Sequence, residues 1–425
     1  MSILTCNEII RRRYALKGAV QGVGFRPFVY HLANELGLKG WVRNDSAGLI
    51  IEVEGGEAKI ADFEKQLQDH KPQNSIVSHI ESFNLTPQFE ADFRILLSDN
   101  HPEITTLMLP DLAICQDCIR EMNDAADRRY RYPFINCTQC GPRFSITTAL
   151  PYDRPNTSMA AFEMCPECER EYQNPLSRRF HAQPIACAHC GPQLELWDQQ
   201  GNRVAYGESA LSQAIMQIEQ GNIIALKGLG GFHLVADATH DLAVQTLRTR
   251  KHRKTKPFAV MYPCLEAIQA DCVIASEEKA LLCSAAAPIV LVLRKPGAVL
   301  SPWIAPNNPY LGVMLPYTPL HHLLLHALKR PIIATSGNRA SEPICIDNQE
   351  ALEQLRDCAD SFLVHNRPII NRADDSIVRI MVGQTTLLRR SRGYAPLPIE
   401  LNEATQQPIL AVGGHLKNTV AYMQG

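Results

Sequence analysis

The chain lacks the features that direct a protein to a membrane or to a polyanion. Its longest apolar stretch, about Leu281–Leu293, contains Ser284 and Pro288 and is too short to span a bilayer. The first residues, Met1–Cys6, show no secretory pattern. A formal net charge of −2 over 425 residues provides no strong field toward nucleic acid or an anionic membrane. We therefore expect a cytoplasmic protein without membrane contact.

The sequence also gives little indication of disulfides, although it contains fourteen cysteines. Eight of them form four Cys-x-x-Cys pairs between Cys115 and Cys190, and the other six are scattered. In a long chain without a secretory pattern, such pairs favour metal binding over disulfides. A redox role would require a thioredoxin-like βαβ context, which is missing here. Because zinc takes four thiolates in structural sites and then has no open position, eight thiolates predict two structural Zn²⁺ ions.

The four pairs belong to an internal repeat, in which Cys165 follows Cys115 by 50 residues. The repeat predicts that the first two pairs hold one zinc and the last two hold the other, although the two other pairings of the four stay open. Segment 105–196 has few long apolar faces, so we expect its fold to depend on the metal. The eight predicted ligands are Cys115, Cys118, Cys137, Cys140, Cys165, Cys168, Cys187 and Cys190.

Arginines between these pairs raise the alternative of a zinc-dependent nucleic-acid-binding module. The arginines that could meet phosphates are Arg128, Arg129, Arg131, Arg178 and Arg179. Many acidic residues interrupt them, and the net charge of −2 disfavours binding to a polyanion. Nucleic acid is therefore the weaker interpretation.

Residues 9–98 alternate short strand-like and helix-like segments in the order βαββαβ, with an extra strand possible at the end. This order predicts a ferredoxin-like α+β sandwich. Strands are expected at 11–17, 38–42, 49–53, 76–83 and 93–97, and helices at 27–36 and 58–70.

A glycine-containing loop, Lys17–Arg26, lies between the first strand and the first helix of this domain. Gly22 and Gly24 of this loop allow a tight turn with N–H groups pointing into a concavity, and the helix dipole adds to the attraction for phosphate. Arg26 can grip phosphate oxygens in a bidentate manner. The expected phosphate-binding positions are Gln21, Gly22, Val23, Gly24 and Phe25.

The string Val20–Arg26, followed by Gly40–Asn44, resembles the signature of acylphosphatases. The resemblance covers residues 9–98. It implies that Arg26 holds the phosphate and that Asn44 positions the attacking water. An acyl phosphate has a good leaving group, so orientation and charge neutralisation suffice without a covalent nucleophile.

The range 205–395 is again α/β in pattern. Apolar strands expected at 223–227, 258–261, 289–293 and 332–335 are separated by helix-like stretches, which predicts a mixed or parallel sheet with crossovers. Arg248–Lys256 carries six cations in nine positions beside one of these strands. Since ligands of α/β domains bind near strand ends, this cluster could neutralise a triphosphate.

Several pieces of this half resemble the YrdC family, which makes carbamoyl-type adenylates from ATP. They are Lys227–His233, Lys251-x-Arg253 with Lys256-Pro257, Ser336-x-Asn338 and, less closely, Arg392-Gly393. The resemblance implies nucleotide binding by Lys251, Arg253, Ser336 and Asn338, with Lys227 and Lys256 as further candidates. Two polar patches, His365-Asn366 and Arg372–Ser376, either line the pocket and hold the Mg²⁺ that accompanies ATP or are plain loops.

The order of acylphosphatase-like domain, two four-cysteine repeats and YrdC-like domain resembles one family, the hydrogenase maturation carbamoyltransferases (HypF). This resemblance implies that carbamoyl phosphate is hydrolysed at Arg26 and that carbamate passes internally to the second site. ATP there converts it to carbamoyl adenylate and pyrophosphate. Family members then transfer the carbamoyl group to a C-terminal cysteine of HypE, where it becomes a cyanide ligand of the nickel–iron centre.

The C-terminal segment, 405–425, departs from the family. Val412–Thr419 looks like the opening phosphate hairpin of the kinase-like domain that performs the transfer, but nothing follows Gly425. We therefore expect a truncated product that makes the adenylate without delivering it to HypE. The rival enzyme is a YrdC-type threonylcarbamoyl-adenylate synthase for tRNA modification, where neither the acylphosphatase-like domain nor the zinc repeats are expected.

Overall fold

The computed structural model describes residues 9–98, 106–399, 401, 406–413 and 419–423. The chain forms two compact units. The first is built on the residues up to Leu109 together with 147–185, and the second on 186–425 together with most of 110–146.

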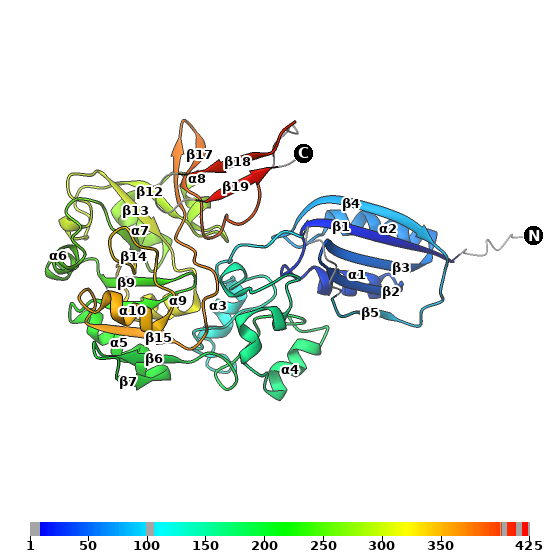
Figure 1. Cartoon of the computed structure of the whole chain (residues 1–425), viewed down its shortest axis with the longest axis horizontal. Helices are drawn as coiled ribbons and strands as arrows, with labels where there is room; N and C mark the ends of the chain where they lie inside the picture. The colour runs from blue at the N-terminus through cyan, green and yellow to red at the C-terminus, as the bar shows by residue number, and fades with distance from the viewer. Residues whose placement is uncertain (1–8, 99–105, 400, 402–405, 414–418, 424–425) are drawn as a thin grey trace, which may run out of the picture. The chain divides into compact units, whose positions relative to one another are not determined.

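The N-terminal domain of the first unit is a five-stranded sheet with two helices (Figure 1). The strand order is β4-β1-β3-β2-β5, and α1 and α2 contact each other and the sheet. Tyr14 and Leu16 of β1 are buried together with Ile60 and Phe63 of α2, which makes the core. The ferredoxin-like prediction, including the extra strand, is confirmed. The elements are β1 (Ile9–Ala19), α1 (Phe25–Glu35), β2 (Lys39–Asp45), β3 (Gly48–Gly56), α2 (Glu57–Asp69), β4 (Ile76–Leu85) and β5 (Phe93–Ile95).

The cysteine-rich segment has little regular structure, and its two short helices follow the repeat. Helices α3 (Gln116–Asn123) and α4 (Pro166–Gln173) each begin directly after the first cysteine of a pair, Cys115 and Cys165. The other elements are single 3₁₀ turns, which are η1 (Phe144–Ile146), η2 (Arg154–Asn156) and η3 (Ser158–Ala161).

The second unit contains a large mixed sheet in the order β17-β16-β12-β13-β10-β14-β9-β8-β15-β6-β7, with β11 paired to β12. The pairs β8–β15, β10–β13 and β12–β16 are parallel and the others antiparallel, which confirms the expected mixed sheet. Its strands are β6 (Leu194–Trp197), β7 (Arg203–Tyr206), β8 (Ile224–Lys227), β9 (Phe232–Asp237), β10 (Ala259–Met261), β11 (Cys272–Val273), β12 (Ile289–Arg294), β13 (Tyr310–Met314), β14 (Ile332–Ser336), β15 (Ser361–His365), β16 (Ile377–Met381) and β17 (Gln384–Arg389).

Helices surround this sheet and bury a continuous apolar core. They are α5 (Gly207–Glu219), α6 (Asp241–Arg250), α7 (Leu265–Asp271), α8 (Ser276–Leu282), η4 (Pro302–Ile304), α9 (Pro319–Leu328) and α10 (Asn348–Leu355). Phe232, Val290 and Phe362 are among the buried residues of this core. Strand β6 begins inside the range 105–196 that the sequence assigned to the zinc repeats, so the sheet starts earlier than the α/β pattern indicated.

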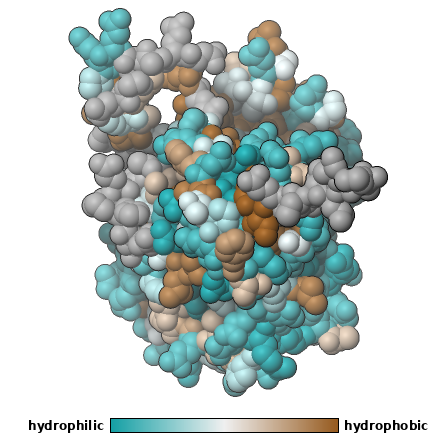
Figure 2. All heavy atoms as spheres, turned by 90° about the vertical axis from the view of Figure 1, so that its right-hand side faces the viewer, coloured by the Kyte–Doolittle hydropathy of each residue, from teal (hydrophilic) through white to brown (hydrophobic). Residues whose placement is uncertain are grey.

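The C-terminal segment contains an antiparallel hairpin of β18 (Ile409–Val412) and β19 (Val420–Met423). Residues 414–418 of the proposed phosphate hairpin lie outside the described residues, as do 402–405 and 424–425. Among the described residues, no helix is long and apolar enough to cross a membrane. The face in Figure 2 is mainly hydrophilic, with separate hydrophobic patches.

Candidate functional site

The loop between β1 and α1 has the backbone geometry expected of an anion site. Gly22 and Gly24 have φ values of 72° and 79°, a region that favours glycine. Gly24 is also the N-cap of α1, and within the described residues no side chain caps this helix. The N–H groups of the first turn are therefore free of a capping side chain and carry the positive end of the helix dipole.

The side chain of Gln21 fixes this loop rather than facing an anion. Its Nε2 donates to the carbonyl oxygens of Asp45 at 2.7 Å and Gly48 at 2.9 Å. Its Oε1 accepts from the backbone N–H of Tyr152 at 2.9 Å. Since the side chains of Val23 and Phe25 are also buried, the loop offers an anion its backbone N–H groups.

The two proposed catalytic residues, Arg26 and Asn44, meet beside this loop. Arg26 lies in the first turn of α1 and is 8% exposed, and Asn44 lies near the end of β2 and is 1% exposed. With the Asn44 amide oriented so that its oxygen faces donors, this oxygen accepts from Nε and Nη2 of Arg26 at 3.3 Å each. A guanidinium, an amide and a ring of N–H groups can bind a phosphate and orient a water molecule.

Three further side chains near Arg26 come from residues 147–185 of the same unit, with Asp153 before the second cysteine repeat and the other two within it. Asp153 Oδ1 accepts from Arg26 Nη2 at 2.8 Å. Tyr172 of α4 packs against His181, with ring centroids 5.0 Å apart. Burial, together with the charge of Arg26, lowers the pKa of His181 to about 4, and burial raises the pKa of Tyr172.

Sequence reasoning missed Asp153, Tyr172 and His181 because they lie more than 100 positions from the acylphosphatase signature. A signal for two of them existed in the repeat itself. Tyr172 and His181 stand where the first repeat has Met122 and Arg131. Such departures from an otherwise regular repeat mark positions with a role of their own.

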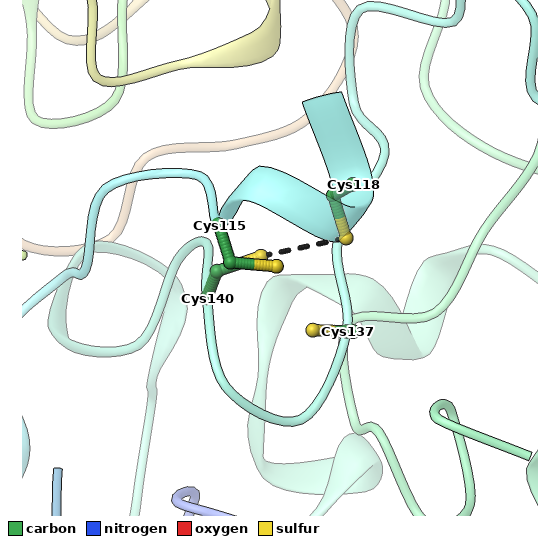
Figure 3. A group of neighbouring side chains, drawn as sticks. All are labelled: Cys115, Cys118, Cys137 and Cys140. Atoms are coloured by element: carbon green, nitrogen blue, oxygen red, sulfur yellow. Dashed lines mark hydrogen bonds between the residues drawn. The ribbon is translucent and has the colours of Figure 1, made fainter. Parts of the chain in front are cut away.

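The eight paired cysteines form two clusters, and the ligand sulfurs of each lie within 4.8 Å of one another. The pairing suggested by the repeat is confirmed. Figure 3 shows the first cluster, with Cys115 and Cys118 at the start of α3 and Cys137 and Cys140 on a following loop. Four sulfurs bound tetrahedrally at ~2.3 Å from a zinc ion lie about 3.8 Å apart. The printed separations are 3.7 Å for Cys118–Cys140 and 3.8 Å for Cys187–Cys190, so both clusters fit structural zinc.

Three arginines of the first repeat form hydrogen bonds or ion pairs with other residues of the protein. Arg128 Nη2 donates to the Sγ of Cys187 at 3.2 Å, and Arg129 Nε donates to the carbonyl of Ala186 at 2.8 Å. Arg131 forms an ion pair with Glu208. N–H donors toward a thiolate stabilise its charge. These contacts engage the arginines within the protein, which weakens the nucleic-acid interpretation.

Replacing Cys137 with serine is expected to reduce bound zinc from two ions per chain toward one and to lower the melting temperature, because thiolate ligation contributes folding free energy. Elemental analysis and thermal unfolding measure this. Cys283→Ser is the matched control, since Cys283 is exposed and lies outside both clusters. Fewer than one zinc per chain in the unaltered protein would contradict the assignment.

Four predicted nucleotide-binding residues come together beyond the end of β14. Lys251 Nζ donates to the carbonyl oxygens of Ser336 at 2.7 Å and Asn338 at 3.2 Å. Ser336 Oγ donates to Asn338 Oδ1 at 2.8 Å. Arg253 Nη1 donates to Thr335 Oγ1 at 2.9 Å. Burial, together with the charge of Arg248, lowers the pKa of Arg253 to about 10. Two cations, a hydroxyl and an amide at a strand end suit a nucleotide phosphate.

Of the other two candidates, Lys256 contacts this group through its backbone, and Lys227 lies on another strand. Lys256 has an exposed side chain, and its carbonyl accepts from Arg253 Nε at 3.0 Å. Lys227 is the last residue of β8. It lies toward the same end of the sheet as Ser336, and β9 separates their two strands. Its Nζ donates to Asn348 Oδ1 at 2.7 Å, and burial lowers its pKa to about 8. Lys227 lines a pocket with Phe134 and Arg367.

One of the two polar patches, Arg372–Ser376, contributes Asp375 to a buried ion-pair cluster. Arg392 Nη2 and His233 Nε2 both contact the carboxylate of Asp375, at 3.0 and 3.1 Å. The guanidinium carbon of Arg392 lies 3.5 Å from the ring centroid of Tyr317. Arg392 therefore does not reach the nucleotide residues, and the Asp375 carboxylate is engaged by two side chains.

Comparisons with known proteins agree with this architecture. Residues 12–95 match the acylphosphatase family, 114–147 and 164–197 match the HypF finger, and 216–391 match the family described as telomere recombination. An acylphosphatase of Actinobacillus succinogenes is 32% identical over 88 residues, which are 20% of this chain and 98% of that protein.

Longer matches cover nearly the whole chain. The carbamoyltransferase HypF of Synechocystis sp. is 55% identical over 406 residues, 96% of this chain and 53% of the relative. The probable carbamoyltransferase HypF of Methanocaldococcus jannaschii is 43% identical over 429 residues, which are 100% of this chain and 55% of the relative. A crystal structure of full-length HypF in the phosphate- and nucleotide-bound form superposes with a TM-score of 0.94 at 47% identity. The match covers 98% of this chain and 55% of that one. The crystal structure of T. kodakarensis HypF superposes with a TM-score of 0.90 at 41% identity. The match covers 98% of this chain and 53% of that one. The chain thus spans about half the length of the curated relatives it matches, and it belongs to the HypF carbamoyltransferase family.

Proposed function

We propose that the chain hydrolyses carbamoyl phosphate at Arg26 and uses ATP to convert the resulting carbamate into carbamoyl adenylate. The observation that carries this proposal is the contact of Arg26 with Asn44 beside the glycine loop. This loop leads into α1, a helix without a side-chain cap. We assign hydrolysis to a domain at 9–98 and adenylate formation to a domain at 205–395, with the zinc repeats of 105–196 between them in sequence and a further domain starting at 405–425.

In the first step, the phosphate of the substrate accepts hydrogen bonds from the N–H groups of the loop and from Arg26. Water oriented by Asn44 attacks phosphorus, and the P–O bond to the carbamoyl group breaks. Arg26 and the N–H groups stabilise the charge that grows on the phosphoryl oxygens. The products are inorganic phosphate and carbamate, and no covalent enzyme intermediate is required.

In the second step, a carbamate oxygen attacks the α-phosphorus of ATP and pyrophosphate leaves. ATP enters as its Mg²⁺ complex, with the ion held mainly by phosphate oxygens and water. Lys251 and Arg253 neutralise the phosphates, while Ser336 and Asn338 orient them. The mutual contacts of Lys251, Ser336 and Asn338 support the assignment, as does the contact of Arg253 with the neighbouring Thr335.

In the longer family proteins, the carbamoyl group is proposed to pass to a cysteine of HypE and to become a cyanide ligand of [NiFe] hydrogenase. A cytoplasmic location suits eight zinc-binding thiolates, because the cytosol keeps thiols reduced. A threonylcarbamoyl-adenylate synthase is not favoured, since that activity has no use for an acylphosphatase site.

Product analysis tests the proposal directly. With carbamoyl phosphate alone the chain is expected to release inorganic phosphate, and addition of ATP and Mg²⁺ is expected to yield pyrophosphate as well. Adenylate formation from threonine and bicarbonate, without any use of carbamoyl phosphate, would contradict it and support the tRNA-modifying alternative.

A further inference from the structure

A carboxylate lies in the proposed phosphate site. Asp153 Oδ1 is 2.8 Å from Arg26 Nη2, the nitrogen that also faces the oxygen of Asn44. The Asp153 side chain is 21% exposed. Within the described residues, its second oxygen, Oδ2, accepts no hydrogen bond. The site therefore contains an acceptor with unused capacity next to its principal cation.

This carboxylate is held in place by its neighbours. The backbone N–H of Asn156 donates to the carbonyl of Asp153 at 2.8 Å. The adjacent Arg154 donates to the carbonyls of Gln183 and Ile185 at 2.8 and 2.9 Å. These contacts fix the backbone that carries Asp153, and the bond to Arg26 orients its carboxylate.

For phosphate binding alone, this arrangement is unfavourable. A carboxylate repels the phosphate dianion and shares the charge of Arg26 with it. His181 does not offset the negative charge at neutral pH, because burial lowers the pKa of this imidazole to about 4. The cost is offset only if the substrate presents a hydrogen-bond donor to Asp153.

A carbamoyl group has such a donor. Its nitrogen is three bonds from phosphorus and carries two N–H groups, whereas acetyl phosphate has a methyl group in the same place. We propose that Asp153 is a specificity-determining residue that accepts an N–H bond from the carbamoyl amide and so selects carbamoyl phosphate over acyl phosphates without a donor. This inference rests on the proposed function at Arg26.

The walls of the site add to the selection. Tyr172 donates its hydroxyl to Gln183 Oε1 at 3.1 Å and packs on His181, which in turn packs on Phe180 with ring centroids 4.7 Å apart. These rings lie close to Asp153, whose side chain is only 21% exposed, so few water molecules can replace the amide when a methyl group stands in its place. An acceptor left unpaired in a site shielded from water costs binding free energy, which is how polar sites reject analogues that lack a donor.

The test compares kcat/KM for carbamoyl phosphate and acetyl phosphate in the zinc-loaded chain. The unaltered chain is expected to prefer carbamoyl phosphate by roughly 100-fold. Asp153→Ala should reduce this ratio to near one. Asp153→Asn should retain part of the preference, because its amide oxygen still accepts an N–H bond. Asp92→Asn is the matched control, since Asp92 is exposed directly before the edge strand β5 and should leave the ratio unchanged.

Inhibition by inorganic phosphate gives a second readout. Because the variants lack the negative charge, phosphate should inhibit Asp153→Asn more strongly than the unaltered chain. An equal loss of both substrates in both variants, with the ratio unchanged, would show that Asp153 only holds Arg26 and would overturn the inference. An unaltered chain that hydrolyses both substrates equally well would also overturn it while leaving the proposed function intact. Hydrolysis of neither substrate would instead refute the proposed function.

Discussion

Replacing Arg26 with alanine is expected to lower phosphate release from carbamoyl phosphate by on the order of a thousandfold. Arg26 is the cation that contacts Asn44 beside the glycine loop, and in the proposed mechanism its bidentate grip stabilises the charge that grows on the phosphoryl oxygens. The measurement is the steady-state rate of phosphate release. Arg26→Lys should recover little, because an ammonium keeps the charge but not the planar fork of donors.

The control for this experiment is Arg94→Ala. Arg94 lies in β5 of the same domain, its side chain is 52% exposed, and it pairs with Glu90 and Asp92 at the surface. Exposed pairs of this kind contribute about 0–1 kcal/mol, so this variant should fold and turn over normally. Asn44→Ala should lower kcat more than it raises KM, since the proposed partner of Asn44 is the attacking water. Unchanged hydrolysis in Arg26→Ala would show that the site lies elsewhere.

Exchange of labelled pyrophosphate into ATP is expected when the chain is given carbamoyl phosphate. Adenylate formation releases pyrophosphate, and an adenylate that stays bound can be attacked by it in reverse. Lys251→Ala or Ser336→Ala should abolish this exchange while phosphate release continues, because only the handling of ATP is lost. Arg250→Ala is the control within the same basic run, since its guanidinium pairs with Asp360 at 2.8 Å.

The same exchange tests whether the two steps are coupled. Arg26→Ala should abolish it, because no carbamate is supplied. Carbamate decomposes quickly in water, so a separate acylphosphatase added in solution should restore the exchange poorly. Exchange that proceeds equally well in Arg26→Ala, or without carbamoyl phosphate, would show that the second site uses another substrate.

The local parts of this protein could be predicted from the sequence because the signals are local. A turn that needs positive φ at Gly22 and Gly24 is visible as two glycines between a strand pattern and a helix pattern. The strands of the first domain were predicted because buried and less buried positions largely alternate along β1. The spacing of each Cys-x-x-Cys pair is set by one turn of chain, so the zinc ligands are also a local feature.

Some strands of the large sheet could not be predicted in the same way. All six residues of β9, Phe232–Asp237, are buried, so there is no alternation to detect. Strand β6 is four residues long and belongs to this sheet only because it pairs with the distant β15. Pairing between strands so far apart in sequence depends on how the whole chain closes, and no local pattern carries that information.

Local motifs were enough to identify the candidate residues for the chemistry, namely Arg26, Asn44 and the eight paired cysteines. The zinc pairing and the side chains that surround Arg26 depend instead on how the chain folds. Asp153 stands in an unremarkable run of sequence, and its importance comes from a 2.8 Å contact across 127 positions of chain. The physical reason is that turns and periodicity follow from neighbouring residues, whereas a site's electrostatics follow from whatever the folded chain brings within hydrogen-bonding distance.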